Sequence, residues 1–335
     1  MSDLLHPVYL PCTAEQLKKH FISVPDGEAL VGGTDGDDRQ LRYYRASISH
    51  WIDYKEIIDA GQSPEPAQVR LGRQMEKDER FWVATALMAL YYAADGAQRA
   101  GAFGGLLELA GLRPPPGYGR WADALTDPVD LFLEVNLPSP RLYRRWLRAN
   151  LNERVPIPYL KERAAEPRSR LEGQTRADAM LIARDSGAAI IFEAKVLSDI
   201  STSVTFDIAR NQLARTIDVM LEDNQDRPDL DQRLRSRKPE LTYVVLLTPA
   251  IMQPSGSAQA LGKSRLYGWL MPEYQDRASG LLRQHLPHRG ERELAEAAGR
   301  LGWASWEDCR AIVPGACPWL GLSHASAQIN TSGPA

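Results

Sequence analysis

Two short apolar segments joined by a turn sequence constrain the fold of this chain most. The segments are "RADAMLIAR" and "AAIIFEAKV", and the tetrapeptide "DSGA" between them is typical of a turn. Residues 176 to 196 are therefore predicted to form an antiparallel β-hairpin. The chain has 335 residues, so it can bury a substantial core as one large domain or as two to three smaller ones.

The composition is that of an ordinary soluble globular protein, with 44% hydrophobic and 25% charged residues. A net charge of −3 gives no global basic signature, so any polyanionic partner must be held by a local patch. The longest apolar stretch, residues 81 to 94, is shorter than the roughly 18 residues of a membrane span and is expected to be a buried helix. The N-terminus lacks the pattern of a secretory signal. We expect a cytoplasmic protein that makes no membrane contact.

The three cysteines are Cys12, Cys309 and Cys317. Their odd number, wide spacing and lack of a C-x-x-C pair argue against a disulfide framework and against a structural zinc site. We expect all three to be reduced.

The chain is predicted to divide into three parts. Residues 1–118 form a mainly helical N-terminal region, whose boundary is the proline and glycine cluster at 114 to 119. Residues 119–315 form the second domain, which includes a helical C-terminal extension. The chain ends in the polar residues 323 to 335, and residues 316–335 are expected to be a disordered tail.

Inside the N-terminal region, residues 31 to 40 are rich in glycine and aspartate and indicate a turn. Residues 41 to 54 are aromatic and β-branched, which is compatible with a strand. Residues 66 to 112 have the apolar spacing of helices.

Elements around the hairpin follow a recognisable order. A helix is predicted from Ser139, which can cap its first turn, and another over residues 203 to 222. Residues 241 to 249 are nearly all apolar and suit a strand that is covered on both faces. The order is helix, strand, strand, helix, strand, and the two segments after it, 264 to 286 and 291 to 313, both have a helical pattern.

The hairpin brings charged residues together. Alternation along its second strand sends Glu193 and Lys195 to one face. Asp178 lies fifteen residues before Glu193, and a turn near 185 to 188 would place it across from this pair. Two carboxylates and one ammonium group are therefore expected to converge.

Such a cluster suits metal-dependent hydrolysis of a phosphodiester. Mg²⁺ prefers oxygen ligands and commonly takes one or two protein carboxylates together with waters and phosphate oxygens, a role that fits Asp178 and Glu193. The ion would polarise the phosphate and lower the pKa of its bound water, while Lys195 would orient the nucleophile and stabilise developing charge.

Asp178 followed by the apolar-flanked Glu193-Ala194-Lys195 resembles the signature of the PD-(D/E)xK nuclease superfamily. The resemblance covers about residues 139 to 250, and Ala177 stands where the motif's name has proline. It implies an α/β fold with a restriction-endonuclease-like core, in which helices cover a mixed central sheet, and with additional helical N- and C-terminal regions.

The resemblance also implies further site residues. The family often places a polar residue on the helix after the motif, and Gln212 is available for that supporting role, with Arg210 and Arg215 nearby as candidate phosphate contacts. A carboxylate from a preceding helix is common in the family. The candidates for this carboxylate are Glu153, Glu162 and Glu172, and the sequence does not choose among them.

The function implied is that of a Mg²⁺-dependent endonuclease, in which Mn²⁺ can substitute and DNA is favoured over RNA as substrate. Restriction, phage defence or repair would be its setting. The alternative is a non-catalytic nucleic-acid-binding or assembly module that keeps a nuclease-like fold. The sequence leaves open whether the protein forms a homo-oligomer.

A second acid-x-lysine motif, Asp53-Tyr54-Lys55, serves as an internal control, because it too has aspartates upstream, at 37 and 38. It lacks an apolar strand and a hairpin turn before it and fits the start of a helix. Context therefore favours the motif at 193 to 195. If that motif instead lay on an exposed hairpin, Glu193 and Lys195 would form only a weak surface pair.

Overall fold

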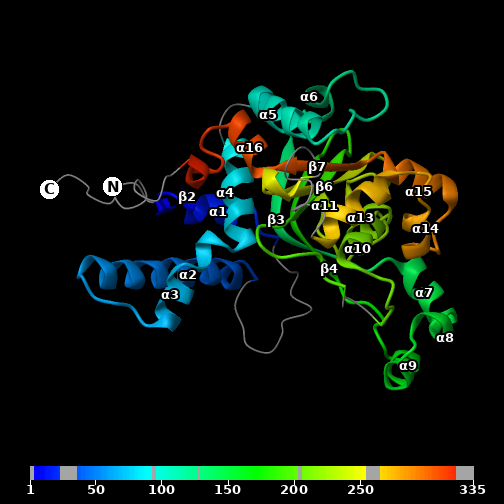
Figure 1. Cartoon of the computed structure of the whole chain (residues 1–335). Coiled ribbons are helices and arrows are strands. Elements are labelled where there is room, and N and C mark those ends of the chain that lie inside the picture. Colours follow the sequence, from blue (N-terminus) through cyan, green and yellow to red (C-terminus); the bar gives the residue numbers. More distant parts are fainter. Residues whose placement is uncertain are drawn as a thin grey trace.

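The computed structural model describes residues 4–22, 36–92, 96–126, 128–202, 206–253 and 265–321. At the centre of these residues is a five-stranded mixed sheet with helices on both faces (Figure 1). The strand order is β3-β4-β5-β6-β7. The strands are β3 (Val129–Leu137), β4 (Thr175–Ala183), β5 (Ala189–Ala194), β6 (Thr242–Thr248) and β7 (Leu301–Ser305). The chain is therefore an α/β protein, as predicted.

The predicted hairpin is confirmed as β4 and β5. The two strands pair antiparallel, with Ala179 opposite Phe192 and Ile182 opposite Ala189. The predicted strand at 241 to 249 is confirmed as β6, which pairs with β5 in parallel. Both strands are buried along their whole length, which explains why their sequences are continuously apolar rather than alternating.

The two outer strands were not predicted from the sequence. Strand β3 pairs antiparallel with β4, and β7 pairs in parallel with β6. The acids Asp130 and Glu134 interrupt the apolar pattern of β3, so it did not resemble a buried strand. Strand β7 has only five residues between two helices, and the prediction of continuous helix over 291 to 313 was wrong there.

Helices from both ends of the chain cover one face of the sheet. They are α4 (Glu79–Tyr92), α5 (Gly96–Leu109), α6 (Trp121–Ala124) and α16 (Trp306–Ile312). Phe81 and Leu87 of α4 belong to the same buried cluster as Phe192 and Val245 of the sheet. The apolar stretch at 81 to 94 is therefore a buried helix through Tyr92, as predicted, and the N-terminal region shares a core with the sheet.

The opposite face is covered by a second helical layer. It comprises α10 (Gln212–Met220), α13 (Leu266–Gln275), α14 (Leu281–His285) and α15 (Glu291–Ala298). Ile217 of α10 and Met271 of α13 pack with Ile191 and Leu246 of the sheet. Helix α10 begins later than the predicted helix at 203 to 222, because the Asn211 side chain caps it by accepting from the amide of Ala214.

Helix α2 (Gly36–Asp59) corrects the strand predicted over residues 41 to 54. Leu41, Tyr44 and Ile48 are buried at the three- and four-residue spacing of a helix, and this periodicity outweighs the aromatic and β-branched composition. Residues 31 to 35 of the turn predicted at 31 to 40 lie outside the described residues. The rest of that range is helical from Gly36.

Three helices lie between β3 and β4 in the chain and project from the body of the molecule, at the lower right of Figure 1. They are α7 (Arg141–Ala149), α8 (Leu151–Arg154) and α9 (Pro158–Ala165). Ser139 does not cap α7 as predicted. Pro140 takes the cap position, and the hydroxyl of Ser139 instead donates to Oε2 of Glu172 at 2.6 Å.

The remaining elements are short. They are β1 (Leu4–His6), β2 (Leu10–Thr13), α1 (Ala14–Lys18), α3 (Pro66–Gly72), α11 (Gln232–Arg235) and the 3-10 turns η1 (Gln74–Glu76), η2 (Pro239–Leu241), η3 (Ala250–Met252) and η5 (Pro318–Gly321). Among the described residues, no helix is long and apolar enough to cross a membrane.

The C-terminal prediction was partly wrong. Ala316 and Cys317 are buried, so the predicted disordered tail does not begin at 316. Residues 322 to 335 of that tail lie outside the described part of the chain. The three cysteines are free thiols and are buried, as expected from their spacing.

Candidate active site at the end of strand β5

The candidate site lies where β4 and β5 separate. Their pairing extends to Ala179 and Phe192, whereas Glu193 and Ala194 remain paired with β6. The amide of Ala194 donates to Oδ2 of Asp178 at 2.7 Å. A side-chain carboxylate thus holds the two strands together after their ladder has ended, and this contact fixes Asp178 beside the motif.

The sheet is locally distorted beside Asp178. In the antiparallel register, Leu133 pairs with Ala179 and Val135 with Ala177, so Glu134 lies opposite Asp178. Glu134 has a φ of 54°, a left-handed conformation that is unfavourable for a residue other than glycine. Leu133 belongs to the core on one face of the sheet and Val135 to the core on the other face. The regular alternation of side chains between the two faces of the sheet is therefore interrupted beside Asp178.

Glu193 and Lys195 form a direct ion pair in the protein interior. Nζ of Lys195 lies 2.7 Å from Oε1 of Glu193, and it also donates to the carbonyl of Ala194 at 2.9 Å. The exposed fraction is 0% for Glu193 and 4% for Lys195, which excludes the alternative of an exposed hairpin with a surface pair. Removing one member of such a pair would leave a buried charge without its partner.

Gln212, on helix α10, holds Glu193 in place. Nε2 of Gln212, the first residue of α10, donates to Oε1 of Glu193 at 2.5 Å. The structure thus places Gln212 where the resemblance implied. The other oxygen, Oε2 of Glu193, is buried and has no hydrogen-bond partner among the described residues. It is a strong acceptor left available inside the site.

A further carboxylate, that of Glu79, was not predicted from the sequence. It lies at the start of α4, and its Oε2 is 3.9 Å from Nζ of Lys195. Its Oε1 accepts from the amide of Val196 at 3.0 Å and from the hydroxyl of Ser198. Glu79 therefore fixes the segment after β5 and adds a third acidic group near the lysine.

The three glutamates suggested by the sequence lie elsewhere. Glu153 on α8 and Glu162 on α9 are exposed on the projecting helices. Glu172 is buried and is paired with arginines rather than with Lys195. Glu79 begins helix α4, and nothing in its local sequence marks it as a neighbour of Lys195.

The electrostatics of the site follow from burial and from crowding of charge. Burial and then the Glu193 carboxylate raise the pKa of Asp178 to about 7. Burial also raises the pKa of Glu193. Burial alone would lower the pKa of Lys195, but the carboxylates of Glu193, Asp178 and Glu79 outweigh it and raise that pKa above its usual value. The lysine stays charged, and the two acids hold protons more tightly than they would in water.

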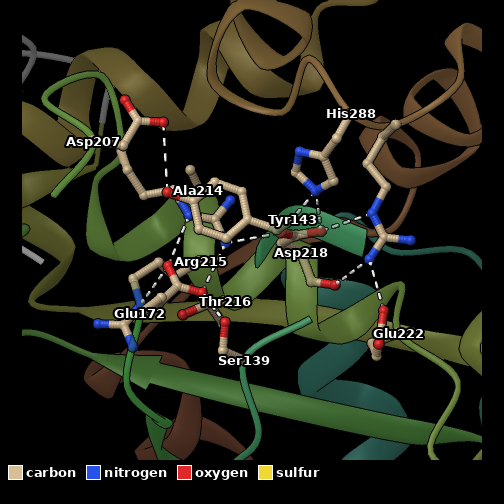
Figure 2. Close-up of polar contacts among 12 residues, drawn as sticks. Ser139, Tyr143, Glu172, Asp207, Ala214, Arg215, Thr216, Asp218, Glu222 and His288 are labelled. Atoms are coloured by element: carbon tan, nitrogen blue, oxygen red, sulfur yellow. Dashed lines mark hydrogen bonds and ion pairs between the residues drawn. The ribbon is translucent and has the colours of Figure 1, made fainter. Parts of the chain in front are cut away.

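Arg210 and Arg215 occupy a second polar cluster, behind α10. Arg210 is fully buried, and its guanidinium binds Glu172 and Asp218 at 2.9 and 2.8 Å and lies 3.8 Å from the centre of the Tyr143 ring. Figure 2 shows Glu172, Tyr143 and Asp218 in this cluster, with Arg215 beside Glu172. Arg210 therefore has no exposed surface for a phosphate contact, and its role here is to join three elements. Arg215 donates to the carbonyls of Gly173 and Gln174 and has limited exposure.

The same cluster includes the C-terminal extension. His288 and Arg289 both bind Asp218, through Nε2 at 3.0 Å and Nε at 2.7 Å. Arg289 also lies 3.3 Å from Glu222. Figure 2 shows His288 and Glu222 on the side of Asp218. Helix α10, which carries Gln212, is thus fixed from both sides, and this sets the position of the hydrogen bond to Glu193.

The internal control motif lies in a different setting. Asp53 and Lys55 are on helix α2, where Lys55 forms an i,i+4 pair with Asp59 at 2.7 Å. No strand of the sheet carries either residue. The helix predicted from the sequence context is confirmed, but the motif lies near the end of α2 and not at its start. This motif supplies a matched control for mutagenesis.

The site offers few side chains that could hold a divalent cation. Among the described residues, no three His, Cys, Asp or Glu side chains are arranged as a metal site. Asp178 and Glu193 nevertheless offer oxygen ligands, and the buried Oε2 of Glu193 lacks a partner. Two carboxylates completed by water and phosphate oxygens are a common arrangement for Mg²⁺, so these residues fit that ion.

Comparison with protein-family models, with curated proteins and with solved structures finds no match to this chain.

Proposed function

We propose that the protein is a metal-dependent nuclease that hydrolyses phosphodiester bonds, with DNA as the favoured substrate. The observation that supports this proposal most is the convergence of Asp178, Glu193 and Lys195 at the end of β5. A structural ion pair would need one acid for one lysine. This site holds a second acid whose pKa is raised to about 7 and a carboxylate oxygen that is buried without a partner.

The roles of the residues follow from their contacts. Asp178 and Glu193 would hold Mg²⁺ or Mn²⁺, which supplies charge neutralisation and activates water. Bringing a cation between the two acids also relieves their repulsion. Lys195, which stays protonated, would orient the attacking oxygen and stabilise charge on the phosphate. Gln212 and Glu79 position Glu193 and Lys195.

A cleavage assay with a matched control tests the proposal. Purified wild-type protein, Lys195→Met and Lys55→Met are incubated with supercoiled and linear DNA in Mg²⁺, in Mn²⁺ and in EDTA. We expect cleavage by the wild type and by Lys55→Met in either metal, none in EDTA, and none by Lys195→Met. Equal cleavage by Lys195→Met and the wild type would contradict the site. DNA binding without cleavage by the wild type would favour the non-catalytic binding module.

A further inference from the structure

The helices that project between β3 and β4 carry an unusual concentration of positive charge. Residues 139–170, here called the basic surface, contain nine arginine and lysine residues and three glutamates, a net charge of +6. The whole chain has a net charge of −3. The basic surface therefore stands out against an acidic remainder, which is the local patch that a polyanionic partner requires.

Several of these cations are free to bind a ligand. Arg145, Arg168 and Arg170 are exposed, and no ion pair joins any of them to a carboxylate within the described part of the chain. Other exposed arginines, such as Arg283 and Arg292 of the C-terminal helices, have acidic partners. The basic surface thus presents charge that is not neutralised from inside the protein.

A hollow of about 580 Å³ opens beside this charge. It lies between α9 and the loop that leads to β4. Its lining includes Arg163, Arg168, Ser169, Arg170, Gly173 and Phe206. Two glutamates also line it, but Glu166 pairs with Arg163 and Glu172 with Arg210 and Arg215. Among the described residues, Arg168 and Arg170 remain as unpaired cations at the hollow, and they suit a phosphate group.

The hollow is close to the candidate active site along the chain. Gly173 lies five residues before Asp178, and at about 3.3 Å per residue the separation is at most about 17 Å. At about 3.4 Å per base pair, this corresponds to roughly five base pairs of a duplex. The contacts of Arg210 with Tyr143 of α7 and with Glu172 keep the basic surface fixed relative to β4. A short duplex is therefore long enough to span the two regions.

A membrane is a poorer partner for this surface. An interfacial helix needs an apolar face that can enter the lipid. The apolar residues Tyr143 and Leu147 of α7 are instead buried against Val155, Ala164 and Leu171. Tyr143 and Leu147 are therefore not free to enter lipid, and the large apolar residues that this region exposes are Leu142, Ile157 and Tyr159.

We propose that the basic surface binds the phosphate backbone of a nucleic-acid duplex and directs it to the cluster of Asp178, Glu193 and Lys195. The binding role stands on charge, exposure and the hollow, and only the delivery of a strand for cleavage rests on the proposed function. Phosphate contacts of this type carry no sequence information, so binding is expected to be independent of sequence and sensitive to salt.

Two triple variants with the same change in net charge test the proposal. The test variant combines Arg145→Gln, Arg168→Gln and Arg170→Gln. The control variant combines Arg120→Gln, Arg283→Gln and Arg292→Gln, three exposed arginines outside the basic surface. Dissociation constants for a fluorescent DNA duplex and for an RNA duplex are measured by anisotropy in Ca²⁺ over a range of salt, and melting temperatures are compared.

The test variant should bind the DNA duplex at least about tenfold more weakly than the control variant near physiological salt, and its logarithmic salt slope should fall by about 2 to 3. An equal loss on the RNA duplex identifies recognition of the backbone alone, and a loss on DNA alone identifies DNA as the partner; both support the proposal. Wild-type affinity and slope in the test variant would overturn it, as would wild-type protein that binds anionic vesicles or acidic peptides but neither duplex.

The assay also separates this proposal from the proposed function. If the wild type cleaves DNA and Lys195→Met does not, while the test variant binds like the wild type, the nuclease stands and the basic surface is wrong. If the wild type binds duplexes through the basic surface and cleaves neither, the surface stands and the catalytic assignment fails.

Discussion

The amide of Ala194 donates a hydrogen bond of 2.7 Å to Oδ2 of Asp178, across the point where β4 and β5 stop pairing. This contact brings an acid from one strand to the acid and the lysine of the next. It also explains how three charged groups remain together at the end of a buried hairpin. Asp178 accepts from the amide of Ala194, and Glu193 and Lys195 pair with each other.

The ion pair between Lys195 and Glu193 predicts a cost in stability as well as in activity. Because both side chains are buried, Lys195→Met should lower the free energy of unfolding by about 3 to 5 kcal/mol, whereas Lys55→Met should cost less than about 1 kcal/mol. Urea unfolding of the three proteins measures the difference. Similar stability in the two variants would show that the pair at 193 and 195 contributes little.

The raised pKa of Asp178 predicts a specific dependence of stability on pH. A carboxyl group that binds its proton more tightly when folded favours folding at low pH, and this contribution is lost as the pH rises from about 4 to about 7. Asp178→Asn stays neutral, so without metal it should melt about 2 °C or more above the wild type at pH 8 and at the same temperature near pH 4. A lower melting temperature for Asp178→Asn at pH 8 would contradict this.

The same pKa predicts how cleavage depends on pH. Since Asp178 must be ionised to bind a cation, the apparent affinity for Mg²⁺ should increase as the pH rises from 6 to 8. Saturating metal should shift the midpoint of the activity profile below 7, because the cation competes with the proton. Initial rates of DNA cleavage at several Mg²⁺ concentrations measure this shift, and a midpoint that ignores the metal concentration would argue against a role of Asp178 in binding it.

Glu79 and Gln212 are predicted to position the site. Glu79→Gln and Gln212→Ala should each reduce cleavage by about 10- to 100-fold while the protein stays folded. Glu153→Gln and Glu162→Gln serve as controls, since both glutamates are exposed on the projecting helices, and they should cleave like the wild type. Kinetics over a range of Mg²⁺ concentrations would show whether the losses arise in metal affinity. Equal rates for Glu79→Gln and Glu153→Gln would exclude a role for Glu79.

Some of this site could be predicted from the sequence because its elements are local. The turn and the two apolar runs define the hairpin, and alternation along β5 places Glu193 and Lys195 on one face. Glu79 could not be predicted in that way. It is 117 residues from Val196, whose amide it binds, and no local pattern links the two.

The missed strand β3 shows the same limit. Its acids Asp130 and Glu134 interrupt the apolar pattern, and each is neutralised by an arginine of the hairpin, Arg184 or Arg176. These acids can be buried because β4 lies beside them and brings the two arginines into contact with them. Arg210 was assigned to phosphate for a related reason, because its partners Glu172 and Asp218 come together only through the packing of α10.

The most direct test of the metal-dependent site is the binding and cleavage of a DNA duplex by the wild type, Asp178→Asn and Asp53→Asn in EDTA, Ca²⁺ and Mg²⁺. If Asp178 and Glu193 share a cation, their charges repel phosphate when the metal is absent. Asp178→Asn should then bind DNA in EDTA as tightly as the wild type or more tightly, gain little from Ca²⁺, and fail to cleave in Mg²⁺. Asp53→Asn should match the wild type throughout. Cleavage by Asp178→Asn in Mg²⁺ at the wild-type rate would contradict the account.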